Sequence, residues 1–297
     1  MEELRKIVQG TLLENEPMSN HTSYGIGGPA GAYITPKDRC DLAEILKFAK
    51  KYSIETHFVG SGSNLLVADS GIDGIVLTPA KSLTQLEFND GHVIAESGVM
   101  LGRLVKECIK RNLTGVESMI GVPGTLGGAL VMNAGAFGHE TWDRVISVNV
   151  INRKGEILKR DPTQYKVEYR NVKGPQNEWF IGALLEFRSD KTSSTEKQKE
   201  MLDLRKHTQP LGKASCGSVF RNPPDSFAAR LIEQSNLKGY KIERYDFPNL
   251  RAINFYIHGL LGEGVSSSHR IDKQAKSLGE YLRAKLIDFP IDLQGEV

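Results

Sequence analysis

Residues 121–138, GVPGTLGGALVMNAGAFG, contain six glycines among eighteen residues. We expect this segment to decide the fold, because so many glycines indicate that something approaches the backbone closely. The turn signal Pro-Gly-Thr at 123–125 opens a short apolar run, and a helix that begins there would turn its first N–H groups toward a phosphate. The small residues at 133–135 end the run. Taken alone, the stretch also fits a buried helix in which residues 127–129 allow close packing.

A second loop of small residues lies about sixty positions earlier, in VGSGSNLLV at residues 59–67. Such residues let consecutive backbone N–H groups converge on one anion, and the serine hydroxyls and the Asn64 amide add further donors. For this loop alone, a tight turn between two strands remains the alternative. The two loops together predict one large ligand, flat or phosphorylated, that lies against the backbone between two lobes.

Two common nucleotide-binding motifs do not fit these loops. A dinucleotide-binding G-x-G-x-x-G motif would need glycine where the chain has Leu65, and a helix should follow at once. The sequence of residues 64–77 instead predicts a turn and a strand. A Walker A loop would need G-K-[ST], which neither loop contains.

The remaining pattern is that of an α/β protein. Apolar residues fall on one helical face in residues 38–51 and again in residues 101–108. The sequence predicts strands in ETHFVG, HVIAESGVML and EWFIGALLEF, and a hairpin that turns near residues 152–155.

Composition excludes several classes of protein. The chain has 297 residues and a net charge of +2, too small to indicate a nucleic-acid partner. The three cysteines have no C-x-x-C spacing and the seven histidines no metal-ligand spacing, so we expect no metal site. With no signal-peptide pattern and no apolar run of about 18 residues, the sequence predicts a cytoplasmic protein without a membrane partner.

Composition changes at residues 188–209, which are polar and rich in lysine. This change predicts a domain boundary near Arg188. Beyond it, the sequence predicts a helix capped at Asp225 and ended at Gly239, and a long final helix that includes residues 275–286.

Five motifs in chain order give the sequence a specific resemblance. They are HTSYGIGGPAGAYITP, FVGSGSNLLV, GVPGTLGGALVMNAGAFG, YRN and SCGSVFRNP. Together they resemble the UDP-N-acetylenolpyruvoylglucosamine reductase family over about residues 20–239. The compact stretch at 170–218 is similar to the type of this family that lacks an extra substrate-covering loop.

The resemblance implies an α/β (α+β) fold: a two-lobed FAD-binding module of the vanillyl-alcohol-oxidase (PCMH) type and a C-terminal α+β substrate domain. The expected divisions are residues 1–75 for the first FAD-binding lobe, 76–190 for the second, and 191–297 for the substrate domain.

The resemblance also implies the reaction, which belongs to peptidoglycan precursor synthesis. NADPH reduces a non-covalently bound FAD, and the flavin then gives hydride to C3 of the enolpyruvyl ether of UDP-N-acetylglucosamine, while a proton goes to C2. The product is UDP-N-acetylmuramate. The implied partner is therefore a UDP-sugar, and we expect a monomer.

Site residues follow from the loops and the motifs. We assign cofactor binding to Gly60, Ser61, Gly62, Ser63, Asn64, Leu65, Gly121, Pro123, Gly124, Thr125, Gly127, Gly128, Asn133, Ala134 and Gly135. Arg170 matches the family residue that polarises the substrate carboxylate, and Ser218 matches the one that delivers the proton to C2. Glu296 matches the family residue that assists stabilisation or protonation of the enol. Arg221 and Asn222 are expected to contact substrate.

The chain departs from the family pattern at three places. Val172 stands where the family usually has serine after YRN, residues 241–259 keep little of the usual sequence, and the chain stops at Val297, earlier than is usual. Two alternatives stay open, and the altered last third suggests the second of them. One is an FAD-dependent oxidase or dehydrogenase with another substrate, and the other is a non-catalytic flavin- or UDP-sugar-binding protein.

Overall fold

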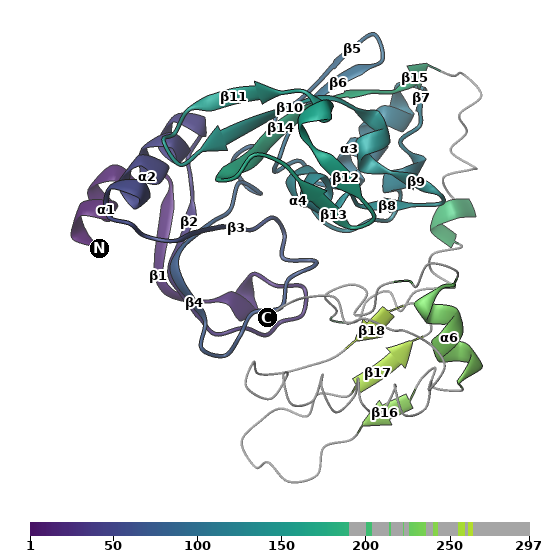
Figure 1. Cartoon of the computed structure of the whole chain (residues 1–297), viewed down its shortest axis with the longest axis horizontal. Coiled ribbons are helices and arrows are strands. Elements are labelled where there is room, and N and C mark those ends of the chain that lie inside the picture. Colours follow the sequence, from purple (N-terminus) through teal and green to yellow (C-terminus); the bar gives the residue numbers. More distant parts are fainter. Residues whose placement is uncertain are drawn as a thin grey trace. The chain divides into compact units, whose positions relative to one another are not determined.

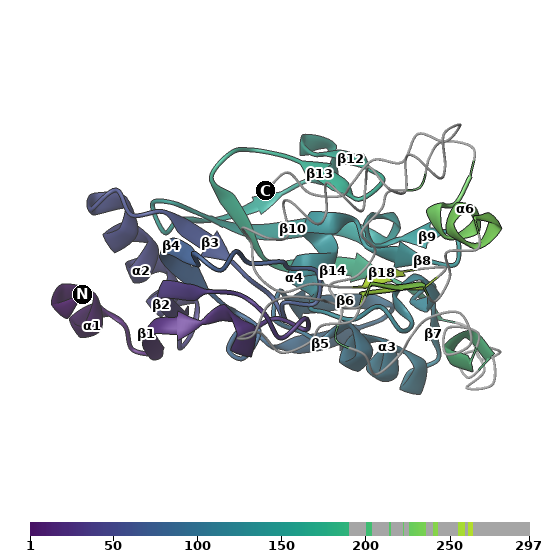
Figure 2. The same cartoon turned by 90° about the horizontal axis from the view of Figure 1, so that it is seen from below.

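The structure is a computed structural model that describes residues 1–189, 200–203, 214, 222, 226–235, 240–242, 255–258 and 261–263 (Figures 1 and 2). The chain groups into two compact units. Unit 1 contains Met1–Glu16, Ala30–Ser61 and Asp73–Leu202, and unit 2 contains Pro17–Pro29, Gly62–Ile72 and Asp203–Val297. The division into residues 1–75, 76–190 and 191–297 stays a prediction.

The first sheet has four strands in the order β1-β2-β4-β3. Its strands are β1 (Thr11–Pro17), β2 (Pro29–Thr35), β3 (Thr56–Phe58) and β4 (Ile72–Leu77). Helices α1 (Glu2–Ile7) and α2 (Arg39–Lys51) lie beside it (Figure 1). The predicted apolar stripe of α2 is buried in the core of this sheet, at Leu42, Ile45, Leu46 and Ala49. As predicted, α2 begins at an aspartate, because the Asp38 side chain accepts hydrogen bonds from the amides of Cys40 and Asp41.

The second sheet has five antiparallel strands in the order β11-β10-β14-β6-β5. Its strands are β5 (Leu86–Asn89), β6 (His92–Glu96), β10 (Val145–Asn152), β11 (Ile157–Arg160) and β14 (Glu178–Glu186). The predicted hairpin is β10–β11, and its turn is closed by a hydrogen bond from the Gly155 amide to the Asn152 carbonyl. Gly155 has φ of +74°, a value that glycine adopts at little cost.

Helices α3 (Leu101–Lys110) and α4 (Leu126–Met132) pack into the core of the second sheet. The predicted stripe of α3 is buried, at Leu101, Leu104, Val105 and Cys108. Strand β10 alternates between two cores, since Val148 and Val150 belong to the α3/α4 core and Ile151 to the α2 core. Both sheets therefore share one folded unit.

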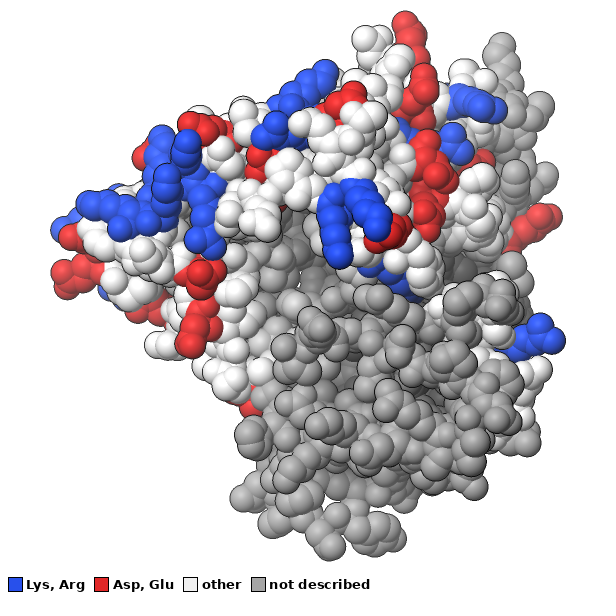
Figure 3. Space-filling view, in the orientation of Figure 1, with Lys and Arg blue, Asp and Glu red and all other residues white. Residues whose placement is uncertain are grey.

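Shorter elements complete unit 1. They are β7 (Leu113–Thr114), η2 (Glu117–Met119), β8 (Gly135–Ala136), β9 (His139–Glu140), η3 (Thr141–Arg144), η4 (Pro162–Gln164), β12 (Lys166–Glu168), β13 (Asn171–Lys173) and β15 (Arg188–Ser189). On the face shown in Figure 3, acidic and basic side chains of the described residues are interspersed. Such mixing differs from the single-sign field of a nucleic-acid surface.

The described part of unit 2 includes η1 (Met18–Asn20), helix α6 (Ala228–Gln234) and a three-stranded antiparallel sheet. The strands of that sheet are β16 (Tyr240–Ile242), β17 (Phe255–His258) and β18 (Leu261–Glu263). Helix α6 is shorter than predicted: its N-cap is Phe227 and not Asp225, and its C-cap is Ser235. The predicted final helix lies outside the described residues. Among the residues described, no helix is long and apolar enough to cross a membrane.

Candidate functional site

The two glycine loops meet inside unit 1. Gly60 follows β3, and a Cβ added there would lie 2.5 Å from Oγ1 of Thr125. Thr125 is the N-cap of α4 and is buried. The Gly60 carbonyl accepts a hydrogen bond from the Thr78 hydroxyl at 3.4 Å. Glycine at position 60 thus lets the end of β3 touch the start of α4, and it places two loops that are distant in sequence side by side.

The continuation of the first loop belongs to unit 2, where it packs on the HTSYGIGG motif. Gly62 has φ of +69°, and its carbonyl accepts a hydrogen bond from the Ser23 amide at 3.0 Å. A Cβ at Gly62 would lie 1.9 Å from the carbonyl oxygen of His21, so no side chain fits there. Residues 21–28 and the first glycine loop are therefore parts of one local structure.

The first N–H groups of α4 are engaged within the protein. The Leu126 amide donates to the Val99 carbonyl and the Gly127 amide to the Ser97 carbonyl, both at 2.8 Å. The Gly128 amide donates to the Thr125 hydroxyl at 3.4 Å. The expectation that the start of this helix holds a phosphate through free amides is therefore wrong for these three groups.

Two buried serine hydroxyls supply donors that the protein itself leaves unused. Oγ of Ser61 and Oγ of Ser97 are buried and have no hydrogen-bond partner among the described residues. Ser97 lies against Gly127, whose added Cβ would be 3.0 Å from the Ser97 Cβ. A buried hydroxyl without a partner costs about 1–3 kcal/mol, so a polar ligand that satisfied it would be stabilised. The sequence reasoning missed Ser97, although it directly follows β6, much as Ser61 follows β3 after two residues.

Gly128 marks an open position on α4. An added Cβ there would find only the Thr125 hydroxyl, at 3.9 Å, and the residue is exposed. Gly121 and Gly124 adopt positive φ, of +69° and +114°. A flat ligand can thus approach the backbone at Gly128 without meeting a side chain of that residue.

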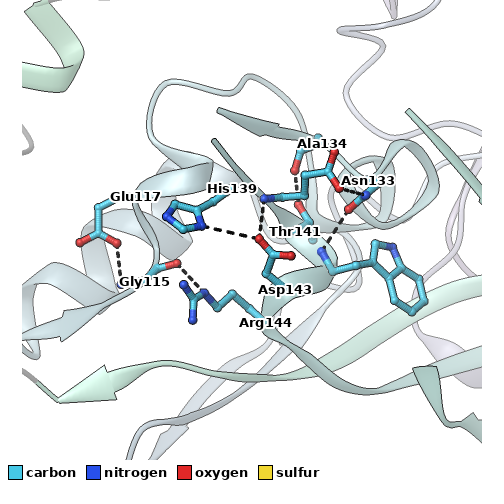
Figure 4. A network of polar contacts seen from close by, with 10 residues as sticks. Gly115, Glu117, Asn133, Ala134, His139, Thr141, Asp143 and Arg144 are labelled. Carbon is cyan, nitrogen blue, oxygen red and sulfur yellow. Dashed lines mark hydrogen bonds and ion pairs between the residues drawn. The ribbon is translucent and has the colours of Figure 1, made fainter. Parts of the chain in front are cut away.

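The cluster at 133–135 is a turn and hairpin rather than a polar cradle. Asn133 is the C-cap of α4 with φ of +44°, and its side chain is buried and bonded inside the protein (Figure 4). Gly135 pairs with Glu140 in the β8–β9 hairpin, where an added Cβ would lie 2.1 Å from the His139 carbonyl oxygen. The polar side-chain atoms of Asn133 thus have partners within the protein, and the assignment of residues 133–135 to cofactor binding stays a prediction.

Arg170 lies at the tip of the β12–β13 hairpin. Glu168 pairs with Asn171, so Tyr169 and Arg170 form the turn. Arg170 has φ of +54°. Non-glycine residues rarely occupy this region, and those that do are often found at functional sites. Its guanidinium carbon is 5.8 Å from the centre of the Tyr169 ring. A hydrogen bond from Lys166 lowers the pKa of the Glu168 carboxyl, which is therefore ionised near neutral pH.

The hairpin packs against α4, the helix that the glycine segment forms. Val172 pairs with Val167 across the hairpin, and both contact the α3/α4 core. An apolar residue at 172 therefore has a packing role, which accounts for valine at the position where the sequence pattern suggested serine.

Comparison with known proteins bears on what this arrangement binds. The model of the FAD binding domain matches residues 30–161, and that of the AtuA ferredoxin-like domain matches residues 199–288. The UDP-N-acetylenolpyruvoylglucosamine reductase of Alkalilimnicola ehrlichii is 44% identical over 238 residues, which are 80% of each chain. That of Coxiella burnetii is 37% identical over 89% of each chain. The chain belongs to the UDP-N-acetylenolpyruvoylglucosamine reductase family.

Solved structures agree with this membership. The crystal structure of the reductase from Thermus caldophilus is similar with a TM-score of 0.74 and 26% identity, and the match covers 97% of this chain and 98% of that one. A 4-ethylphenol oxidase from Gulosibacter chungangensis, at 16% identity and a TM-score of 0.50, covers 71% of this chain and 48% of that one and shows the fold alone. The predicted fold class is confirmed: an FAD-binding module of PCMH type precedes a ferredoxin-like α+β domain.

Several predicted residues of the family site lie outside the described residues. They are Ser218, Arg221 and Glu296. Asn222 is described, and its Oδ1 accepts a hydrogen bond from the Ala228 amide at 3.1 Å. That contact caps the first turn of α6 and explains why Asp225 is not needed as the cap.

Proposed function

We propose that this chain reduces UDP-N-acetylglucosamine enolpyruvate to UDP-N-acetylmuramate, with NADPH as the reductant and FAD as its bound cofactor. The observation that carries the proposal is its similarity to reductases of this name over 80–89% of the chain, at 37–44% identity. A UDP-sugar is then the partner. We further propose a cytoplasmic monomer, as the resemblance implies.

The described residues fit FAD. The hydroxyls of Ser61 and Ser97 offer two buried donors, and the exposed backbone at Gly128 offers an open surface on α4. Gly62 to Leu65 continue the first loop, and Gly121 to Thr125 form the turn before the helix. When bound, FAD supplies the hydride chemistry that amino-acid side chains lack.

Arg170 is proposed to bind the carboxylate of the enolpyruvyl group. Hydride addition at C3 pushes negative charge toward that carboxylate, and a guanidinium can meet both of its oxygens at once. A non-glycine residue with φ of +54° supports a functional role, because such a conformation persists only where the surroundings impose it. Ser218 is proposed to protonate C2, Glu296 to assist, and Arg221 and Asn222 to bind the substrate.

A steady-state assay tests the proposal. Purified protein is mixed with NADPH and UDP-N-acetylglucosamine enolpyruvate, and the oxidation of NADPH is followed. The mass of the sugar nucleotide is measured by mass spectrometry. We expect substrate-dependent NADPH oxidation and a product heavier by two hydrogens. Oxidation of small alcohols with no effect of the UDP-sugar would show another oxidoreductase, and bound flavin without turnover of any substrate would show a binding protein.

A further inference from the structure

Asn133 is a buried asparagine whose side-chain amide joins three segments of unit 1. Figure 4 shows the contacts of Asn133 with the η3 segment. It is 2% exposed. Its Nδ2 donates one hydrogen bond to the carboxylate of Glu140 and another to the carbonyl of Glu168, at 3.4 Å. Its Oδ1 accepts from the Trp142 amide at 3.2 Å. The two N–H groups and the oxygen each have a partner, as expected of a buried amide with a fixed orientation.

Two of these partners belong to a rigid segment. Glu140 and Asp143 form a reciprocal capping box at η3, in which each side chain accepts a hydrogen bond from the other's backbone amide. The Trp142 indole donates to the Leu130 carbonyl at 2.8 Å, and its ring lies 4.9 Å from that of Tyr165. This segment therefore holds the Asn133 amide from one side.

The third partner belongs to the turn that carries Arg170. Glu168 is the residue at which β12 ends, and Arg170 follows two positions later. Strands β12 and β13 form a sheet of their own, and a two-stranded hairpin is only marginally stable alone. Arg170 also has to be kept at positive φ. A contact from a buried, fixed amide to the carbonyl at the start of the turn restrains both.

We propose that Asn133 is a positioning residue for Arg170. Through the Glu168 carbonyl it fixes the β12–β13 turn, so that the Arg170 guanidinium is held in the orientation that the enolpyruvyl carboxylate requires. The inference rests on the proposed function. It adds a residue that acts on the substrate step without contacting the substrate.

The test separates positioning from folding with two variants. Asn133→Asp tolerates positive φ as asparagine does, but it removes the donor to Glu168 and sets one carboxylate against another at Glu140. Adding Glu140→Gln repairs that pair, because the glutamine amide donates to the new carboxylate at position 133, and the net charge returns to that of the wild type. In the double variant the hydrogen bond to the Glu168 carbonyl stays lost, and an acceptor oxygen of residue 133 faces that carbonyl in place of the donor.

The two half-reactions are measured separately in the flavin-loaded full chain by rapid mixing. For the double variant we expect wild-type flavin content and a wild-type rate of flavin reduction by NADPH, with a lower melting temperature because the carboxylate at position 133 is buried against a carbonyl oxygen. Re-oxidation by the enolpyruvyl UDP-sugar should be slower by about ten- to a hundredfold, the size of effect expected from a small misplacement of a reacting group. Re-oxidation at the wild-type rate, or equal slowing of both half-reactions, would overturn the inference.

Two further comparisons complete the test. Asn112→Asp is the matched control, because Asn112 has φ of +54° and is exposed, and it should leave both half-reactions unchanged. In an Arg170→Lys background, the double substitution should slow re-oxidation little further, whereas an independent, multiplicative slowing would contradict the coupling. Failure of the wild type to re-oxidise would reject the proposed function instead, so the two failures are distinguishable.

Discussion

At the scale of single residues, the protein's own packing requires some glycines of the two loops and leaves room for a side chain at others. A Cβ added at Gly60, Gly62 or Gly127 would collide with Thr125, His21 or Ser97, respectively. Gly128 meets nothing closer than 3.9 Å. The density of glycine at 121–138 therefore reflects the chain's own close approaches as well as a ligand, and Gly128 is the position that reports on the ligand.

We predict that Gly128→Ala keeps the fold and weakens flavin binding. Alanine favours a helix over glycine by up to about 1 kcal/mol, so thermal stability of the apoprotein should not fall. The added methyl would occupy the open surface proposed for the cofactor. Flavin content and affinity are measured by absorbance and equilibrium titration.

Gly102→Ala is the control for this prediction. Gly102 is also helical, in α3, with nothing within 4 Å of an added Cβ, so the variant should bind flavin like the wild type. If Gly128→Ala also bound flavin with unchanged affinity, the cofactor would have to lie elsewhere.

Arg170 combines backbone strain with function, and the two can be separated. Arg170→Asn suits positive φ and should stabilise the protein by up to about 1 kcal/mol, whereas Arg170→Lys keeps the strain and should leave stability unchanged. Both variants should slow re-oxidation strongly, since neither offers a planar two-point cation. Urea unfolding and rapid mixing measure the two effects. Re-oxidation of the flavin at the wild-type rate in Arg170→Lys would show that Arg170 has a structural role only.

At the scale of elements, the sequence predicted what local periodicity encodes. The apolar stripes of α2 and α3 and the β10–β11 turn are set by residues close in sequence, and the structure confirms them. The turn signal at 123–125 also predicted the start of α4, whose N-cap is Thr125. The partners of its first amides were not predictable in this way, because they are the carbonyls of Ser97 and Val99, almost thirty residues earlier. The same holds for Asn133, whose partners include Glu168.

A partly buried ion pair links helix α2, which packs on the first sheet, to strand β6 of the second sheet. The Arg39 Nε of α2 donates to Oε1 of Glu96 of β6 at 2.9 Å, and the other Glu96 oxygen accepts from the Gln85 amide at 2.7 Å. The Glu96 side chain is only 6% exposed. Arg39 lies on helix α2 and Glu96 on strand β6, 57 residues later, so no local sequence pattern pairs them and sequence reasoning could not find this ion pair.

We predict that Glu96→Ala destabilises the protein by about 2 kcal/mol, less than for a fully buried pair because the Arg39 side chain is 35% exposed. The substitution leaves both Arg39 and the Gln85 amide without their acceptor. Urea unfolding of the apoprotein measures the change. Lys47→Ala, which removes an exposed pair with Glu44, is the control and should have no measurable effect; equal stability in both variants would show that the link between the sheets contributes nothing.

At the scale of the whole molecule, motif order predicted more than composition did. Composition limited the chain to a globular protein with a boundary near Arg188, and the glycine loops predicted a large ligand. The resemblance of the five motifs to the family implied a flavin-dependent reductase. Family membership and the FAD-binding fold are confirmed. The roles of Ser218, Arg221 and Glu296 stay predictions, because those residues lie outside the described part of the chain.

The central claim is that the bound flavin of this protein gives its electrons to an enolpyruvyl UDP-sugar. The most direct test is anaerobic: the flavin band at about 450 nm is bleached with one equivalent of NADPH, and UDP-N-acetylglucosamine enolpyruvate is then added. We predict that the band returns in proportion to the substrate added. A flavin that NADPH bleaches but that stays bleached after the UDP-sugar is added would contradict the account.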